Sequence, residues 1–136
     1  MYLIYNIIIF IVIILYLPVI IYNKIKGGYK EGVKEKFSFI SDEKINSINN
    51  KSVIWIQAAS VGEVMAAKPL IKSLKNKYPE RKIVLSTMTD TGRETAKKID
   101  LVSTIIYFPF DFNWFVKRSL YKIDPDLVIL FETELW

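Results

Sequence analysis

Cysteine and histidine are both absent from the 136 residues of this chain. The lack of cysteine excludes disulfide bridges, thiolate zinc sites and cysteine nucleophiles, and the lack of histidine excludes a Ser-His-Asp triad. Acid–base chemistry within this chain must therefore use carboxylates, lysine or tyrosine.

A stripe of basic residues with interleaved aromatics is also missing, although the net charge is +5. That stripe is what a nucleic-acid-binding surface requires, so we expect no nucleic-acid partner. Basic residues gather instead within 24–36, against only Glu31 and Glu35; they are Lys24, Lys26, Lys30, Lys34 and Lys36. This pattern is typical of a segment that rests on anionic lipid headgroups.

Charge is absent from Tyr2 to Tyr22, a run of 21 residues. As a helix this run would be about 32 Å long, enough to cross a hydrocarbon core of about 30 Å. We interpret 1–23 as a transmembrane anchor that is retained, because the positive front and cleavage site of a signal peptide are missing. The basic flank follows the span, which predicts that the globular part is cytoplasmic. The alternative is a β-rich or core segment, since isoleucine dominates and Pro18 interrupts the run.

Residues 24–51 contain Gly27-Gly28, scattered charge and an Asn/Ser/Lys-rich end, which indicates a basic juxtamembrane connector with a short helix. Phe37, Phe39 and Ile40 either enter the headgroup layer or pack under the domain, and the pattern does not decide between these.

Four short runs rich in β-branched residues follow from Ser52 onward, at Val53–Gln57, Lys82–Thr87, Thr104–Phe108 and Leu127–Phe131. Helix-like segments separate them, which predicts an α/β, Rossmann-like domain over 52–136 with a parallel sheet. The first helix places Val64, Ala67, Ile71 and Leu74 on one face and Lys68, Lys72 and Lys75 on the other; the later helices are expected at about 92–99 and 114–123.

The last run ends where a further loop and helix would follow, so we expect a truncated gene product or a fragment of marginal stability.

The sequence Ser60-Val61-Gly62-Glu63 at the first strand exit has two interpretations. As a capping box, Ser60 accepts the third helical N–H and Glu63 reaches back to the Ser60 N–H. Thr91 and Glu94 repeat this spacing at the next helix. As a functional group, Glu63 is a general base at the edge of the sheet where ligands collect, with Gly62 allowing close approach.

The other strand exits also carry polar residues. Thr89, Thr91 and Gly92 could hold phosphate or sugar hydroxyls, or could serve as ordinary turn and cap residues. Glu132 and Glu134 share one side of the fourth strand exit, where acidic residues have no packing purpose, which favours a functional role for at least one. A Walker-A lysine and a G-x-G-x-x-G motif are both missing.

Five blocks occur in order along the chain: WIQAASVGEV at 55–64, PLI at 69–71, STMTDTG at 86–92, FPFD at 108–111 and ETELW at 132–136. Together they resemble the N-terminal half of 3-deoxy-D-manno-octulosonate (Kdo) transferase. The resemblance covers 52–136, and the anchor and connector agree with it in character.

The resemblance implies a membrane-bound glycosyltransferase of the two-domain GT-B type at the inner membrane, which transfers Kdo from CMP-Kdo to the lipid A precursor in lipopolysaccharide biosynthesis. It implies Glu63 as the base that deprotonates the acceptor hydroxyl, with Glu132 in the closing block. Ser60, Gly62 and Lys68 become acceptor-binding or supporting candidates, as do the connector lysines. No metal and no cofactor are implied, and the donor CMP-Kdo would bind a C-terminal half that this chain lacks.

Two positions depart from the family pattern: Gln57 stands where histidine is common, and Lys36 where arginine is common. Gln57 can form a hydrogen bond but cannot titrate. Two other functions stay open: a membrane-tethered α/β module that binds lipid or a partner without catalysis, and a related GT-B enzyme acting on another lipid-linked sugar.

Overall fold

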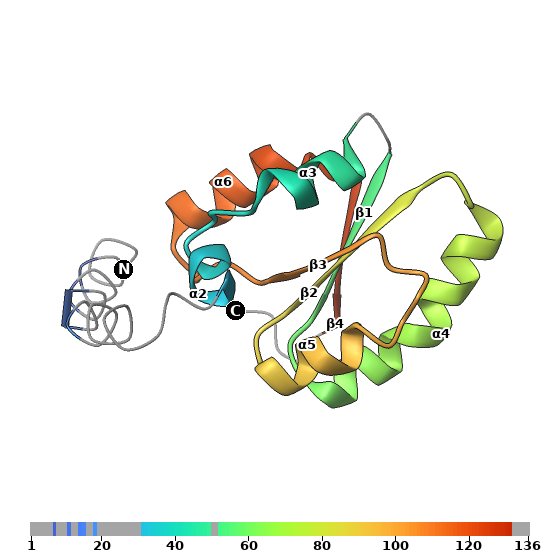
Figure 1. Ribbon diagram of the computed structural model, residues 1–136, viewed down its shortest axis with the longest axis horizontal. Coiled ribbons are helices and arrows are strands. Elements are labelled where there is room, and N and C mark those ends of the chain that lie inside the picture. Colours follow the sequence, from blue (N-terminus) through green and yellow to red (C-terminus); the bar gives the residue numbers. More distant parts are fainter. Residues whose placement is uncertain are drawn as a thin grey trace.

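The computed structural model describes residues 7, 11, 14, 15, 18, 31–49 and 52–131 (Figure 1). Most of the predicted anchor at 1–23, the connector residues 24–30, Glu132 and Glu134 lie outside the described residues. Within the described part of the chain, no helix has the length and apolar character needed to cross a membrane. The anchor therefore stays a prediction, and so do the domain boundaries.

A four-stranded parallel sheet forms the centre of the domain (Figure 1). Its strands are β1 (Val53–Ala58), β2 (Lys82–Thr87), β3 (Thr104–Tyr107) and β4 (Leu127–Phe131), in the order β3-β2-β1-β4. The sequence prediction of four strands in a Rossmann-like α/β fold is confirmed. β1 and β2 lie in the middle of the sheet and are buried on both faces, which is why β1 is apolar except at Gln57 and β2 contains the apolar run Ile83-Val84-Leu85.

Helices cover both faces of the sheet. On one face α4 (Val61–Lys77) and α5 (Asp90–Ala96) pack on Ile54, Ile56 and Leu85. On the other face α3 (Asp42–Ile48) and α6 (Asn113–Ile123) pack on Val53, Trp55 and other residues of the strands, with α2 (Glu31–Lys36) against β3 (Figure 1). β4 is an edge strand, and Leu127, Val128 and Leu130 are exposed on it.

The predicted inner face of α4 is confirmed, since Val64, Ala67 and Ile71 are buried and Leu74 packs on the same cluster. The prediction that Lys68, Lys72 and Lys75 share a solvent-exposed face of α4 is wrong for one residue. Lys75 is half-buried, because its Nζ donates to the carbonyls of Pro79 and Arg81 beyond the end of the helix.

Helix α5 begins two residues earlier than predicted and ends three residues earlier. The predicted Thr91/Glu94 capping box is wrong. Thr89 is the cap, because its Oγ1 accepts the Gly92 N–H at 3.0 Å. Glu94 pairs instead with Lys97 on the helix surface.

The described part of the connector forms two helices, α2 and α3, rather than one short helix. Ile40 is buried in the core, and the Phe37 ring meets the Phe110 and Phe115 rings at centroid distances of 5.1 and 5.3 Å. Phe39 is 52% exposed. The structure thus places Phe37 and Ile40 in packing against the domain and leaves Phe39 outside.

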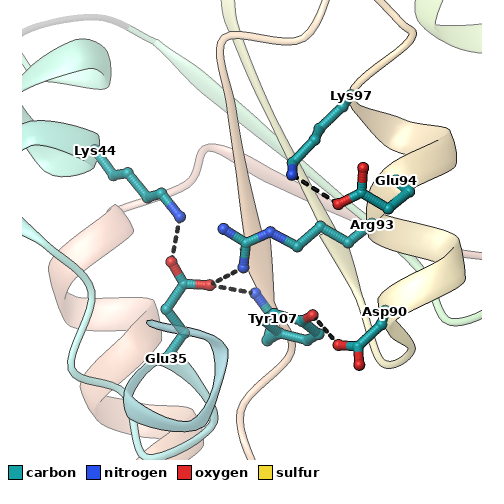
Figure 2. A network of polar contacts seen from close by, with 7 residues as sticks. All are labelled: Glu35, Lys44, Asp90, Arg93, Glu94, Lys97 and Tyr107. Atoms are coloured by element: carbon teal, nitrogen blue, oxygen red, sulfur yellow. Dashed lines mark hydrogen bonds and ion pairs between the residues drawn. The ribbon is translucent and has the colours of Figure 1, made fainter. Parts of the chain in front are cut away.

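Glu35 attaches α2 to the domain through a buried polar network (Figure 2). Its carboxylate is 1% exposed and forms ion pairs with Lys44 of α3 and with Arg93 of α5, the latter at 3.0 Å. It also accepts the Tyr107 N–H at 2.9 Å, at the end of β3. Burying a lone carboxylate costs several kcal/mol, so these partners are what allow Glu35 to lie inside.

The Tyr107 ring is enclosed at the same junction. The Arg93 guanidinium lies 4.7 Å from the ring centroid and the Lys36 ammonium 5.1 Å from it, while the hydroxyl donates to Asp90 (Figure 2). Burial, helped by the hydrogen bond to Asp90, raises the pKa of Tyr107 to about 12. The phenol is therefore held protonated as a donor.

Gly32 is the contact point of α2 on this ring. A β-carbon built at Gly32 would lie 2.7 Å from Cδ2 and 2.9 Å from Cζ of Tyr107, closer than such atoms pack. We expect Gly32→Ala to lower the free energy of unfolding by about 1–3 kcal/mol through overpacking, measured by urea denaturation.

Gly62→Ala is the matched control, because a β-carbon there has Ser60 Oγ at 4.0 Å as its nearest contact. It should leave stability unchanged or raise it slightly. Equal effects of the two substitutions would contradict the packing of α2 on Tyr107.

A second prediction concerns high pH. The pKa of Tyr107 is raised in the folded state from 10.0 to about 12, so its contribution to stability is complete below pH 10 and is lost as pH rises toward 12. The unfolding free energy of the wild type should fall, relative to Tyr107→Phe, by on the order of 2 kcal/mol over that range. Urea denaturation of both proteins measures this, since the lysine titrations are common to both. A difference that stays constant with pH would refute the raised pKa.

Candidate active site

The carboxyl ends of the parallel strands meet at one edge of the sheet, and the strand order changes direction there. From β1 the chain proceeds to β2 and β3 on one side, whereas β4 pairs on the other side of β1. Ala58 at the end of β1 pairs with Phe131 at the end of β4. Open α/β sheets bind ligands at such a switch point, so a ligand site is expected at the β1 exit.

Glu63 lies directly at this exit, in the first turn of α4. Ser60 is the N-cap, with its Oγ 3.5 Å from the Glu63 nitrogen, so the predicted serine cap is confirmed. The Glu63 carboxylate accepts the Ala59 N–H through Oε2 and the Ser60 hydroxyl through Oε1, the latter at 3.2 Å.

The partner of the carboxylate differs from the prediction by one residue. The sequence predicted the Ser60 N–H, and the structure shows the Ala59 N–H. The reason is that β1 ends at Ala58, which leaves the next N–H without a ladder partner on the edge of the sheet. Glu63 satisfies that donor and is thereby aligned with the strand end.

The space beside Glu63 is open at Gly62. The nearest atom to a β-carbon at Gly62 would be Ser60 Oγ at 4.0 Å, and Gly62 is exposed. A hydroxyl-bearing ligand can approach the half-buried carboxylate past this glycine. The arrangement supplies an oriented carboxylate at a helix N-terminus, which is suited to accept a proton from a hydroxyl group.

The β2 exit loop contacts the backbone of the same residue, Ala59. The Ala59 carbonyl accepts the Met88 N–H at 3.1 Å and lies 3.4 Å from the Thr89 hydroxyl. Gly92 is required here, because a β-carbon would lie 2.8 Å from Thr89 Oγ1 and 3.4 Å from the Ala59 oxygen. Thr91 is exposed, and its hydroxyl lies 3.4 Å from Thr89 Oγ1. Thr89 and Gly92 thus act in capping and packing, while a ligand role for the loop stays a prediction.

The remaining predicted site residues do not join Glu63 in the described part of the structure. Lys68 is exposed on α4, five residues after Glu63, and is therefore turned away by about 140°. Glu132 and Glu134 lie outside the described residues. Among the residues that the structure describes, no group of three or more acidic side chains could hold a metal ion.

Sequence reasoning missed a buried polar chain beside the β1 exit. The Trp55 Nε1–H donates to Ser86 Oγ at 2.7 Å, and the Ser86 hydroxyl donates to Gln57 Oε1. Gln57 and Ser86 are register partners on adjacent strands, and both are fully buried. The signal available in the sequence was a polar residue near the carboxyl end of each strand, Gln57 in β1 and Ser86 in β2, but their pairing depends on the register.

Two buried polar atoms near this edge have no hydrogen-bond partner among the described residues, namely Gln57 Nε2 and Thr87 Oγ1. Both residues stand at the carboxyl ends of central strands. The strand ends near Glu63 therefore hold unused hydrogen-bonding capacity.

Comparison of the sequence with known proteins identifies relatives of this chain. A family model described as 3-deoxy-D-manno-octulosonic-acid transferase (kdotransferase) matches residues 31–136. A 3-deoxy-D-manno-octulosonic acid transferase of Haemophilus influenzae is 37% identical over 109 residues, which cover 79% of this chain and 25% of the relative. A protein of the same name from Chlamydia trachomatis serovar D is 33% identical over 86 residues, covering 62% of this chain and 20% of the relative.

A bifunctional glycosyltransferase/methyltransferase of Fusobacterium nucleatum is 34% identical over 119 residues, covering 79% of this chain and 18% of the relative. No solved structure matches. The chain spans a quarter or less of the length of these relatives. Because the family model covers 31–136, more than half of the chain, the chain belongs to the 3-deoxy-D-manno-octulosonic acid (Kdo) transferase family.

Proposed function

We propose that this chain belongs to the acceptor-side half of a membrane-anchored Kdo transferase, with Glu63 as the general base. The observation that carries the proposal is the position of Glu63 at the switch point of the sheet, with its carboxylate held by Ala59 and the space over Gly62 open. Membership of the family supplies the reaction class.

The proposed reaction uses the carboxylate as follows. Glu63 accepts the proton of an acceptor hydroxyl, and the oxygen forms a bond to the anomeric carbon of Kdo. The bond from that carbon to the CMP phosphate breaks, and CMP leaves. The acceptor is the lipid A precursor, and CMP-Kdo binds to a C-terminal half of the GT-B fold outside this chain. No metal or other cofactor takes part.

The Ser60 hydroxyl and the Ala59 N–H position the Glu63 carboxylate in this scheme, and the exposed Lys68 is a candidate contact for a phosphate of the acceptor. Glu132, in the closing sequence block, is a further candidate. Residues 1–23 anchor the protein in the inner membrane, and the globular part lies in the cytoplasm.

A second candidate function is a membrane-tethered module that binds a lipid or a partner without catalysis. One observation favours it: both carboxylate oxygens of Glu63 already accept hydrogen bonds within the chain, which a purely structural cap also requires.

Glu63→Gln in the full-length transferase separates the two functions. The amide keeps an oxygen for the Ala59 N–H, and its NH₂ can donate to Ser60 Oγ, so the cap survives while proton acceptance is lost. We expect the rate of Kdo transfer to fall by about 10²- to 10⁴-fold with little change in melting temperature, measured with CMP-Kdo and a lipid A precursor.

Glu94→Gln is the matched control, because Glu94 is an exposed carboxylate that pairs only with Lys97 among the interactions seen. It should transfer Kdo at the wild-type rate. A folded Glu63→Gln protein with wild-type activity would reject the general base and favour the binding module.

Removal of Tyr2–Tyr22 tests the anchor. Without this segment the protein should leave the membrane fraction after a high-salt wash, because salt screens the remaining basic contacts. Membrane fractionation followed by immunoblotting measures this. Persistent association through the wash would contradict a role of 1–23 as the anchor.

A further inference from the structure

Helix α6 carries an outward stripe that its packing does not explain. Trp114, Lys117, Arg118 and Tyr121 are spaced i, i+3, i+4 and i+7, so they share one side of the helix. The opposite side holds the buried Ser119 and Ile123. Trp114 is 51% exposed and Tyr121 is 88% exposed. Large aromatic rings are thus held at the surface.

Arg118 lies close to two exposed rings, those of Phe39 and Trp114. Its guanidinium carbon lies 4.9 Å from the Phe39 ring centroid and 5.2 Å from the Trp114 ring centroid. Its Nε is enclosed and has no hydrogen-bond partner among the described residues, and none of the ion pairs there involves Arg118. The Arg118 guanidinium therefore lies beside two aromatic rings, and no ion pair within the described residues neutralises its charge.

The charge of the helix indicates the kind of partner. Asn113–Ile123 contains Lys117, Arg118 and Lys122 and no acidic residue. A planar guanidinium beside aromatic rings suits an anionic oxygen group such as phosphate. Tryptophan and tyrosine favour the boundary between an apolar layer and water. Anionic phospholipid headgroups combine both properties.

The position of α6 agrees with such a partner. Phe37, the residue that follows α2, packs on Phe115 of α6 at a ring-centroid distance of 5.3 Å. α2 begins at Glu31, so only residues 24–30 separate it from the proposed anchor, and seven residues reach at most about 25 Å. This part of the inference rests on the membrane location proposed above. The tether keeps this end of the domain close to the bilayer.

We propose that the α6 stripe, formed by Trp114, Lys117, Arg118 and Tyr121 together with Phe39, docks onto the anionic phospholipid headgroups of the membrane. Arg118 contacts lipid phosphate, and Trp114, Tyr121 and Phe39 enter the interfacial layer around it. The docking holds the domain in a fixed orientation on the membrane, with α4 and α5 on the face of the sheet opposite to α6.

The test uses the absence of cysteine from this chain. Tyr121→Cys provides a unique thiol for a fluorophore on the stripe, and Ser73→Cys provides an exposed control on α4. The labelled 136-residue chains, with residues 1–23 retained, are placed in nanodiscs with or without phosphatidylglycerol. Quenching by spin-labelled lipid and by aqueous iodide then reports the surroundings of each label.

We expect lipid quenching at position 121 in anionic nanodiscs and none at position 73. Arg118→Glu should lower the ratio of docked to undocked protein by about fivefold or more, since each basic residue near such a surface contributes about 1 kcal/mol. Lys72→Glu, the same charge change on exposed α4, should leave the ratio unchanged.

Three results would overturn the proposal: a label at 121 that stays equally open to iodide on anionic nanodiscs, lipid quenching abolished by millimolar inorganic phosphate, or shielding from iodide without lipid quenching. The second would show a free-phosphate site, and the third a protein contact. Flotation of the unlabelled chain separately reports the anchor. If the chain floats with the membranes but shows no lipid quenching at position 121, the stripe is rejected and the anchor is kept. If lipid quenching at 121 occurs but a salt wash abolishes both the quenching and the flotation, the anchor is rejected and the stripe is kept.

Discussion

The backbone of Ala59 makes the contacts on which the geometry of the candidate site depends. Its N–H donates to the Glu63 carboxylate, and its carbonyl accepts the Met88 N–H. Both groups lie just past the end of β1, where the ladder of the sheet no longer pairs them. The backbone of one residue therefore joins the start of α4 to the loop before α5. Glu63 takes its orientation from the centre of the sheet rather than from a mobile loop, as a preorganised base requires.

Buried polar groups serve two different purposes in this domain. Glu35 is fully compensated by Lys44, Arg93 and the Tyr107 N–H, so its burial fastens α2 to β3 and α5. Gln57 is only partly compensated, because its oxygen accepts from Ser86 while its Nε2 has no partner among the described residues. The first arrangement fixes how the segment after the proposed anchor meets the domain. The second leaves a donor beside the switch point.

Much of the fold was predictable because its elements are specified locally. All four strands were found from β-branched runs, and α4 from its apolar face, since these patterns follow directly from the periods of strand and helix. The prediction failed where two residues competed for one local role. Thr89 and Thr91 both offered a cap for α5, and Thr89 is the cap because its Oγ1 accepts the Gly92 N–H. Similarly, Lys75 looked solvated by position, yet it reaches carbonyls beyond the helix.

The sequence by itself determined the α/β class, the family resemblance, the Ser60 cap and the place of Glu63 at a strand exit, because each depends on residues close together in the chain. Only the tertiary structure decided which residues they contact. The strand order placed Glu63 at the switch point, the register joined Gln57 to Ser86, and the docking of α2 buried Glu35 beside Arg93 and Tyr107. Glu35 and Tyr107 stand 72 positions apart, and no local pattern records contacts over such separations.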